Sequence, residues 1–253
     1  TSNLNIYTYD GSISNLTSFF KRIHPNVVIH LSSKFVVDHN DKDVDELVQS
    51  NLLFGLHLLE AMKQSNVKDL VNTGTSWQHF NDEDYNPVCL YAATKQAFES
   101  LLEYYVQLED FRVVTLKLFD TYGEFDTRSK LFNILKNYSS SEQELSLSPG
   151  DQFLNLVHVD DVCRAFILSL SFLGKDTESF HRRYLVRSPV SYSLKEVVDI
   201  YKNVTGSNLR VDWGGRPYRR REVMVPTDNG VVLPNWSPLI DLETGLRRLK
   251  GEG

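Results

Sequence analysis

The sequence predicts an α/β protein built on a doubly wound parallel sheet, followed by a smaller C-terminal lobe. Three apolar runs are typical of buried strands: residues 27–31, a run that begins at Leu70-Val71, and residues 113–119. Helical patterns of roughly 10–15 residues separate these runs, and strands that alternate with such helices are typical of parallel sheets. Ligand sites in such sheets lie beyond the carboxyl ends of the strands.

The N-terminal part supplies further elements in order. Residues 5–9 alternate weakly between apolar and polar side chains and predict a strand that ends at Asp10-Gly11. The apolar positions of residues 13–20 predict a short helix, which His24-Pro25 closes. The next helix, over residues 47–62, is apolar nearly all round.

A long helix is predicted from about Leu90. Its apolar positions recur at the spacing of an amphipathic helix, at Phe98, Leu101, Leu102 and Tyr105. The other faces are taken by Gln96, Glu99, Ser100 and Glu103. Pro87, just upstream, is a plausible stop before the helix begins.

Tyr91 and Lys95 stand four residues apart at the start of this helix. Side chains at that spacing share one face, with Cβ atoms about 5–6 Å apart, so the ammonium can hold the pKa of the phenol below its usual value near 10. A tyrosine tuned in this way is a general acid or base that works near neutral pH. A chance pair on an amphipathic helix is the alternative, and the wider context decides.

After Gly123 the alternating pattern changes. A polar loop at residues 139–141 precedes a strand near residues 154–159 and a helix from Asp160-Asp161 through Leu170. A second helix follows from Tyr192. An arginine-rich stretch at residues 216–221 leads to a terminal helix at 242–249.

Composition narrows the class of protein. The chain has 253 residues, 41% of them apolar and 24% charged, which is an ordinary globular composition. No apolar run approaches the ~18–20 residues of a membrane span and no signal-peptide pattern opens the chain, so we expect a cytoplasmic protein with no membrane partner. The formal net charge of −6 argues against nucleic acid as a partner.

No metal site is expected from the sequence. Cys89 and Cys163 lack metal-ligand spacing and are too few for a disulfide framework, so we interpret them as reduced structural thiols. The seven histidines show no HExxH or comparable spacing. Residues 158–161 could suggest ligands, but an aspartate at the start of a helix stabilises the helix dipole, and we prefer that interpretation.

Seven short motifs are spread over nearly the whole chain. They are Asp10-Gly11, His30-Leu31-Ser32-Ser33, Asn51, Thr73-Gly74-Thr75, Tyr91-Ala92-Ala93-Thr94-Lys95, Leu118-Phe119-Asp120-Thr121-Tyr122-Gly123 and His158-Val159-Asp160-Asp161. Together they resemble the extended short-chain dehydrogenase/reductases of the NAD-dependent epimerase/dehydratase family. Within that family, residues 72–79 and 85–91 are most similar to CDP-abequose and CDP-paratose synthase-like nucleotide-sugar 4-ketoreductases of O-antigen pathways.

The resemblance implies a Rossmann-like fold with separate cofactor-binding and substrate-binding parts. We expect a cofactor domain over residues 1–125, with returning segments at about 151–190. The substrate-binding lobe is expected over residues 126–150 and 191–253. A homodimer is left open.

The resemblance also implies three catalytic roles. Tyr91 is the acid/base, Lys95 lowers its pKa and holds the nicotinamide ribose, and Thr75 orients the substrate oxygen. Hydride delivery to a ketone leaves negative charge on its oxygen, which a phenol and a hydroxyl can stabilise. A strand-end threonine that caps its own turn is the alternative for Thr75.

Further contacts are implied for the cofactor and for the substrate. The cofactor contacts are Asp10, Gly11, Leu31, Ser32, Ser33, Lys34, Asn51, Thr73 and Phe119, with Tyr91 and Lys95. The substrate contacts are Ser76, Trp77, Asp120, Arg216, Arg219 and Arg221. A solvated turn is the alternative for Asp10, a buried structural role for Asn51, and a solvated face for the arginines, although guanidinium forks suit a diphosphate.

The chain also departs from the family pattern. The Gly-rich turn that places the cofactor pyrophosphate on a helix N-terminus is absent, so we expect the first βαβ unit to be lacking from this sequence. Leu154 and Asp120 stand where many members carry arginine and asparagine. Ser76-Trp77 follow Thr75 in place of the Asp-Glu pair that a 4,6-dehydratase needs, so dehydration is disfavoured.

The function implied first is NAD(P)H-dependent reduction of a 4-keto-6-deoxy nucleotide sugar, or of its 3,6-dideoxy counterpart. The cofactor would be NAD or NADP, with NADPH for a reductase. A nucleotide-sugar epimerase is the alternative within the same fold, and the sequence does not decide between them. A non-catalytic nucleotide-sugar-binding protein is the alternative from another class, since the Gly-rich turn is absent; Thr75, Tyr91 and Lys95 argue against it.

Overall fold

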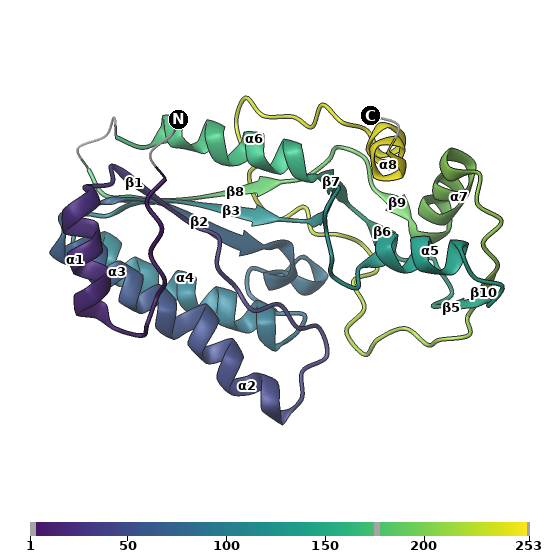
Figure 1. The fold of residues 1–253 in the computed structure, drawn as a ribbon, viewed down its shortest axis with the longest axis horizontal. Helices are drawn as coiled ribbons and strands as arrows, with labels where there is room; N and C mark the ends of the chain where they lie inside the picture. The colour runs from purple at the N-terminus through teal and green to yellow at the C-terminus, as the bar shows by residue number, and fades with distance from the viewer. Residues whose placement is uncertain (1–3, 175–177, 252–253) are drawn as a thin grey trace. The chain divides into compact units, whose positions relative to one another are not determined.

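The computed structural model describes residues 4–174 and 178–251, which fold into two compact units (Figure 1). Unit 1 comprises Thr1–Gln78, Cys89–Lys117 and Phe166–Tyr184, and unit 2 comprises His79–Val88, Leu118–Ala165 and Leu185–Gly253. The chain therefore passes between the two units several times.

Unit 1 alternates strands with helices. Its elements are α1 (Ile13–Ile23), β1 (Val27–His30), α2 (Asp41–Val48), η1 (Gln49–Leu53), α3 (Phe54–Gln64), β2 (Asp69–Thr75), η2 (Ser76–Gln78), α4 (Leu90–Leu108), β3 (Arg112–Leu118), η4 (Leu170–Phe172) and β8 (Phe180–Val186). The predicted strands at 27–31, from Leu70, and at 113–119 are confirmed as β1, β2 and β3. The predicted helices at 13–20 and from Leu90 are confirmed as α1 and α4.

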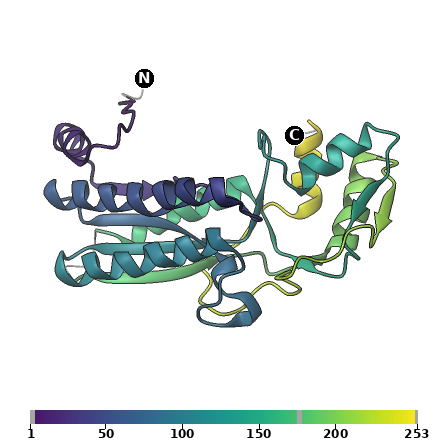
Figure 2. The same cartoon turned by 90° about the horizontal axis from the view of Figure 1, so that it is seen from below.

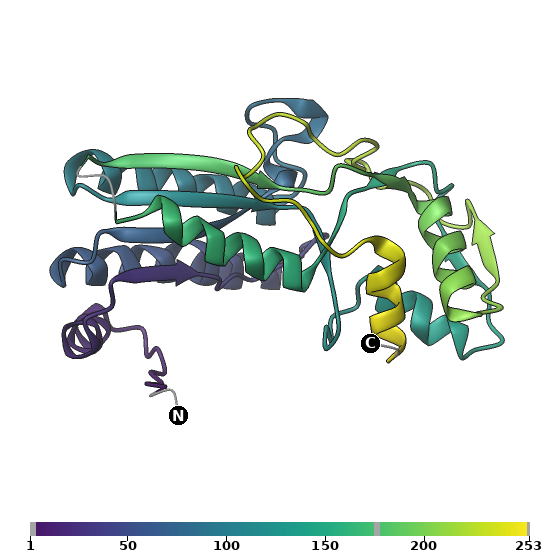
Figure 3. The same cartoon turned by 90° about the horizontal axis from the view of Figure 1, so that it is seen from above.

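The strands of unit 1 form one parallel sheet in the order β1-β2-β3-β8. β1 and β2 pair from Val27 beside Asp69 to His30 beside Asn72. Helices α3 and α4 cover one face of the sheet (Figure 2). The last turn of α6 (Val159–Ser169), which belongs to the same unit, lies on the other face (Figure 3). The predicted α/β fold with a parallel sheet is confirmed.

The core of unit 1 explains why these segments are helices and strands. Apolar side chains from α3 and α4 pack on β2 and β3, because the helical spacing turns one stripe of each helix toward the sheet. The largest fully buried members include Leu59, Met62, Leu70, Phe98, Leu102 and Phe111. α4 therefore has a fixed position over β2, and its first turns lie near the carboxyl end of that strand.

Three expectations for unit 1 are wrong in detail. Residues 4–10 form no regular secondary structure, because a strand needs a paired neighbour and no described strand runs beside them. β1 is not buried on both faces, since it is the edge strand of the described sheet, and Ile29 is exposed. Glu99 does not lie on a solvent face of α4 but is 1% exposed.

The helical run expected at 47–62 is longer and less regular. It begins at Asp41, where Asn40 and Asp43 form a capping box, and it continues to Gln64. Between α2 and α3, residues Gln49–Leu53 take a π-helical turn that contains the buried Asn51. Single π-turns of this kind often occur at functional sites, because the extra residue turns a side chain inward.

Unit 2 contains small sheets and helices. Its elements are η3 (Phe80–Asp82), β4 (Asp120–Tyr122), α5 (Leu131–Ser139), β5 (Leu145–Leu147), β6 (Phe153–Leu154), β7 (Leu156–His158), the first part of α6, β9 (Tyr192–Ser193), α7 (Leu194–Thr205), β10 (Val211–Trp213) and α8 (Leu242–Lys250). The pairs β4–β7 and β5–β10 are parallel, and β6–β9 is antiparallel. Helices α6, α7 and α8 were predicted from the sequence. Helix α5 was not predicted, and neither was strand β8 of unit 1.

Asp161 joins two parts of unit 2. It lies in the first turn of α6, is fully buried, and accepts hydrogen bonds from the backbone N–H groups of Leu239 (3.0 Å) and Ile240 (2.9 Å) and from Arg164 (2.6 Å). Its neighbour Asp160 is exposed and pairs with Arg248 at 2.9 Å. A buried carboxylate is tolerated only when donors surround it, so these contacts make Asp161 a structural residue.

We expect Asp161→Ala to lower the free energy of unfolding by about 2–4 kcal/mol and the melting temperature by roughly 5–10 °C, because two backbone donors lose their acceptor. Asp160→Ala is the matched control and should cost less than about 1 kcal/mol, because its ion pair is exposed. Thermal melts of both variants measure this. Equal melting temperatures would contradict the structural role of Asp161.

Candidate active site

Tyr91 and Lys95 lie on the first two turns of α4. The ring of Phe35, from the segment after β1, meets the ring of Tyr91 edge to face with centroids 4.9 Å apart. Phe35 also lies 5.8 Å from the ring of Trp77, which follows β2. The structure thus brings together the carboxyl ends of two neighbouring strands and the start of α4, as parallel-sheet topology predicts.

The ammonium of Lys95 is buried. The residue is 2% exposed, and burial lowers its pKa from 10.5 to about 8, against the opposing effect of the Glu99 carboxylate. Among the described residues, no hydrogen bond reaches the Lys95 ammonium, which carries three donors. His30, on β1, stays neutral near pH 7, because burial and then the charge of Lys95 lower its pKa to about 4.

Thr75 is the last residue of β2 and is 8% exposed. Its hydroxyl oxygen accepts a hydrogen bond from the backbone N–H of Trp77 at 3.3 Å. This is the local turn contact that the alternative interpretation of Thr75 foresaw. A hydroxyl that accepts one bond keeps its own O–H as a donor, so the contact also orients that donor.

Asn51 holds the segment after β1 against α4. Its side-chain oxygen accepts from the backbone N–H of Lys34 (2.7 Å) and the hydroxyl of Ser33 (3.1 Å). Its amide group donates to the Lys34 carbonyl (3.0 Å) and the Thr94 hydroxyl (2.9 Å). The structure therefore gives Asn51 four partners within the chain, which fix the loop beside Tyr91.

The other residues assigned to the cofactor lie in different settings. Leu31 and Ser32 are exposed, and Lys34 pairs with Glu46 of α2 at 2.5 Å, which raises the pKa of Lys34. Thr73 donates to the His30 carbonyl at 2.8 Å. Asp10 is exposed and accepts from Asn15 (2.7 Å) and the backbone of Ser12 (3.0 Å).

Gly11 and Phe119 are the remaining two residues that the sequence predicts to contact the cofactor. Gly11 has a φ of +86°, which favours glycine, and open space where a side chain would project. Phe119, in unit 2, is buried under the guanidinium of Arg187, 5.5 Å from its ring. Ser76 opens the short helix η2 together with Trp77.

In unit 2 the structure brings Asp120 and Arg219 close enough to interact. Burial raises the pKa of the Asp120 carboxyl to about 6, whereas the positive charges of Lys130 and Arg219 oppose that rise. Arg216 is exposed and lies beside β5, where its backbone N–H donates to the Leu147 carbonyl at 3.1 Å. Asp120 and Arg219 therefore interact electrostatically within unit 2.

Arg221 is differently engaged. Its guanidinium lies over the ring of Phe80 at 4.3 Å and donates to the Asn86 side chain, so it packs against the loop of residues 79–88. The stretch of arginines that the sequence presents as one cluster is thus divided. Arg221 contacts its own unit, and Arg216 projects from an exposed position.

Three residues near the site were not singled out from the sequence. Phe35 contacts both Tyr91 and Trp77, while Gln78 and Glu99 are buried behind Thr75. Gln78 lies three residues after the Thr73-Gly74-Thr75 motif, within the stretch 72–79 that carried the resemblance, but no role was assigned to it. An aromatic directly after a Ser-Ser-Lys strand end was the available signal for Phe35.

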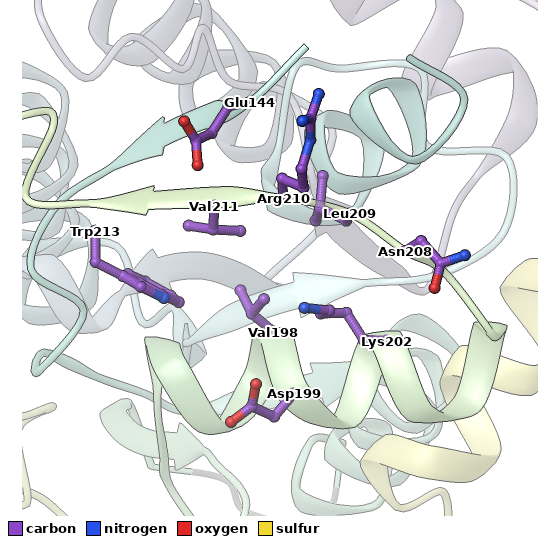
Figure 4. A pocket seen from close by; sticks show the side chains of 9 residues that line it. All are labelled: Glu144, Val198, Asp199, Lys202, Asn208, Leu209, Arg210, Val211 and Trp213. Carbon is purple, nitrogen blue, oxygen red and sulfur yellow. The ribbon is translucent and has the colours of Figure 1, made fainter. Parts of the chain in front are cut away.

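Unit 2 also contains an open cavity of about 390 Å³ between α7 and β10 (Figure 4). It is lined by Glu144, Val198, Asp199, Lys202, Asn208, Leu209, Arg210, Val211 and Trp213. The lining contains two acidic and two basic side chains, so its formal charges cancel and do not favour an anion. None of the predicted site residues lines it.

Within residues 4–174 and 178–251, no group of three or more His, Cys, Asp or Glu side chains could hold a metal ion. No helix in the same described ranges is long and apolar enough to cross a membrane.

Comparison with known proteins establishes the family. Residues 5–180 match the NAD dependent epimerase/dehydratase family, and the chain therefore belongs to that family. Its members are NAD(P)-dependent epimerases and reductases of the extended short-chain dehydrogenase/reductase group. The resemblance found in the sequence motifs is confirmed.

Three individual proteins illustrate the similarity. CDP-abequose synthase of Yersinia pseudotuberculosis is 29% identical over 224 residues, which cover 87% of this chain and 75% of that protein. UDP-glucuronate 4-epimerase of Thermodesulfobacterium geofontis is 26% identical over 259 residues, covering 96% and 78%. The structure of RMD from Pseudomonas aeruginosa complexed with NADPH has a TM-score of 0.82 at 21% identity, covering 98% and 88%.

The buried ammonium generates a stability prediction. The pKa of Lys95 is about 8 in the folded protein and 10.5 in the unfolded chain, so the unfolded chain binds the proton more tightly. The buried ammonium therefore destabilises the folded state, and this destabilisation has its full value below about pH 8. We expect Lys95→Met to raise the free energy of unfolding at pH 7 by about 1–3 kcal/mol. The gain should shrink as the pH rises from about 8 to 10.5.

Urea unfolding at several pH values measures this effect. Lys34→Met is the matched control, because Lys34 lies in an exposed ion pair and its replacement should change stability by less than about 0.5 kcal/mol. A Lys95→Met variant that is less stable than the parent at pH 7 would show that the ammonium is not penalised by burial.

Proposed function

We propose that this chain catalyses the NAD(P)H-dependent reduction of a 4-keto-6-deoxy nucleotide sugar, or of its 3,6-dideoxy counterpart. The proposal is supported by family membership and by the similarity to CDP-abequose synthase over 87% of the chain. That relative's name points to a CDP-linked sugar as the substrate class. O-antigen or other surface-polysaccharide synthesis is the corresponding pathway class.

The observation that carries the proposal is the buried Lys95 ammonium, one helical turn from Tyr91. Lys95 is 2% exposed, and within the described residues no hydrogen bond takes up its three N–H donors, so this largely buried ammonium favours a polar ligand. The hydroxyls of a nicotinamide ribose would supply such acceptors. The residues around Lys95 therefore fit a nicotinamide cofactor, and Asn51 ties the backbone of Lys34 to Thr94, the residue before Lys95.

A bound, reduced nicotinamide would supply a hydride to the ketone carbon. The chain then has to provide for the ketone oxygen. Tyr91 donates its phenolic proton to that oxygen, and Thr75 donates a second hydrogen bond from its hydroxyl. The positive charge of Lys95 stabilises the phenolate that Tyr91 leaves behind.

For the cofactor we propose NADPH, since reductases of this kind consume reduced cofactor. NAD is the alternative. The residues proposed for its binding remain Asp10, Gly11, Leu31, Ser32, Ser33, Lys34, Asn51, Thr73, Tyr91, Lys95 and Phe119. Asn51 would act by holding the loop, because its amide is already used by Lys34, Ser33 and Thr94.

For the substrate diphosphate we propose Arg216 and Arg219. Their guanidinium groups can each present two parallel donors to phosphate oxygens, which an ammonium cannot do. Asp120, Ser76 and Trp77 are proposed for the sugar. Arg221 would contribute through the position of the loop at Phe80 and Asn86, which its guanidinium contacts.

A second candidate is a nucleotide-sugar 4-epimerase. The similarity to UDP-glucuronate 4-epimerase extends over 96% of this chain and favours it. The same tyrosine, lysine and threonine would serve both reactions. The two differ in whether reduced cofactor is consumed or returned.

Tyr91→Phe tests the assignment of the proton donor. We expect turnover of the full-length enzyme to fall by about 10²-fold or more while nucleotide-sugar binding and folding stay nearly unchanged, because only the phenolic proton is removed. Steady-state kinetics and a thermal melt measure both. Near-normal turnover would end this assignment.

A double variant tests the diphosphate clamp. Replacing Arg216 and Arg219 with alanine should raise the KM for the nucleotide sugar at least about tenfold, because charge-assisted hydrogen bonds contribute roughly 1.5–3 kcal/mol each. The KM for the nicotinamide cofactor should stay unchanged, and lysine replacements should restore only part of the loss.

Arg220→Ala is the matched control, since Arg220 lies in the same exposed stretch and has no assigned contact. It should leave both KM values at the parent level. An unchanged KM for the nucleotide sugar in the double variant would place the clamp elsewhere and return these arginines to a solvated face.

A further inference from the structure

The buried side chain of Gln78 connects the strand that carries Thr75 with the helix that carries Tyr91. Gln78 is fully buried, and its side-chain oxygen accepts from the backbone N–H of Thr75 at 2.9 Å. Its amide nitrogen donates to Gln96 at 2.6 Å and to Glu99 at 2.8 Å, both on α4. One amide therefore links β2 to α4 through three hydrogen bonds.

Glu99 anchors the other end of this link. It is 1% exposed, and its second carboxylate oxygen lies 3.1 Å from the Arg183 guanidinium of β8 and 4.0 Å from the Lys117 ammonium of β3. A carboxylate without water is stable only when cations and donors surround it in this way. Strands β3 and β8 thus fix Glu99, and Glu99 fixes Gln78.

The packing at Gly74 shows how closely these groups approach β2. A Cβ atom at Gly74 would lie 3.1 Å from the side-chain oxygens of both Gln78 and Glu99. That separation is tighter than an ordinary contact, so any larger residue would push the two side chains away from the strand. The absence of a side chain at Gly74 lets the link form.

We propose that Glu99 and Gln78 are positioning residues of the reaction, which hold the end of β2 against α4 and place a fixed negative charge one helical turn from Lys95. This inference rests on the proposed function, since it concerns the alignment of Thr75 with Tyr91. Gln78 acts on Thr75 by binding the Thr75 backbone N–H, and the negative charge of Glu99 acts on Lys95. Neither touches a reacting atom.

The charge of Glu99 matters because Lys95 is buried. The groups that face Lys95 are Glu99 on its own helix and the neutral His30 on β1, besides Tyr91 one turn earlier. Burial lowers the pKa of Lys95 and Glu99 raises it, with the balance at about 8. Without Glu99 the pKa of Lys95 falls further, and less ammonium is present at alkaline pH.

Glu99 itself faces charged or titratable groups from two neighbouring strands. Lys117 approaches it from β3, while Arg183 and His181 approach it from β8. Glu103, one turn further along α4, pairs with the same Arg183 and with His181 at 2.8 Å. Glu103 makes no contact with Gln78 in the described structure, so it offers a matched comparison.

Glu99→Gln in the full-length enzyme tests the proposal. We expect the alkaline limb of the pH profile of kcat/KM to move to lower pH by about one unit, because a buried charge one turn away is lost. Glu103 lies on the same helix as Glu99 and pairs with the same Arg183. In Glu103→Gln the alkaline limb of the kcat/KM profile should therefore stay at the pH found for the parent enzyme. A limb that moves equally in both variants, or in neither, would overturn the proposal.

Two further variants separate alignment from charge. Glu99→Asp keeps the charge but shortens the reach to Gln78, so the limb should stay while kcat falls. Gln78→Leu removes the link without any change of charge, and kcat should fall at least about tenfold with the nucleotide-sugar KM unchanged. An unchanged kcat in Gln78→Leu would exclude the positioning role, even where Glu99→Gln fails to fold.

A readout without turnover keeps this test apart from the proposed function. The ionisation of Lys95 in the unliganded protein can be followed by NMR of isotope-labelled lysine, with Lys95→Arg for assignment. Glu99→Gln should lower its midpoint, and Glu103→Gln should not. A parent protein that turns over no nucleotide sugar would refute the proposed function, whereas an unmoved Lys95 midpoint in Glu99→Gln would refute the role of Glu99.

Discussion

The burial of two opposite charges on one helix is the constraint on which unit 1 depends. Lys95 and Glu99 stand one turn apart on α4, and each is at most 2% exposed. Removing an ion from water costs several kcal/mol unless partners compensate. Arg183 on β8 and Lys117 on β3 compensate Glu99, so the burial of this charge on α4 depends on both strands. Gln78 connects the backbone of Thr75 with the same Glu99, and we propose that this link aligns the Thr75 hydroxyl with the phenol of Tyr91.

Much of the fold and the centre of the site could be predicted, because their signals are local. The apolar runs of β1, β2 and β3 lie within a few residues, and Tyr91 and Lys95 are related by one helical turn. Gln78 and Glu99 escaped prediction because their partners are remote. Arg183 is 84 residues from Glu99 along the chain, and it lies on β8, a strand whose mixed charged and aromatic residues carry little strand signal. A glutamate on an amphipathic helix normally faces water, and only the tertiary structure shows otherwise.

Two other residues show how a motif and its surroundings carry different information. The sequence singled out Asn51, but the π-turn of Gln49–Leu53 that points it inward has no local signature, and neither do its bonds to Lys34 and Thr94. The sequence placed Arg216 and Arg219 ahead of Arg221 within one arginine-rich stretch, but it did not show what each of them contacts. The structure distinguishes them, because Arg221 lies over Phe80, a residue 141 positions earlier, whereas Arg219 interacts with Asp120. Contacts of this kind depend on how distant segments pack.

The proposed reduction and the alternative epimerisation would use the same tyrosine, lysine and threonine, and they would differ in the fate of the hydride. A reductase consumes one reduced cofactor for each ketone, whereas an epimerase recovers its cofactor in every cycle. The most direct measurement is therefore the number of moles of NADPH oxidised per mole of CDP-linked 4-keto-6-deoxy sugar converted by the full-length protein, with the products separated by chromatography. We expect one mole per mole. Interconversion of nucleotide sugars with no net oxidation of NADPH would contradict the reductase assignment.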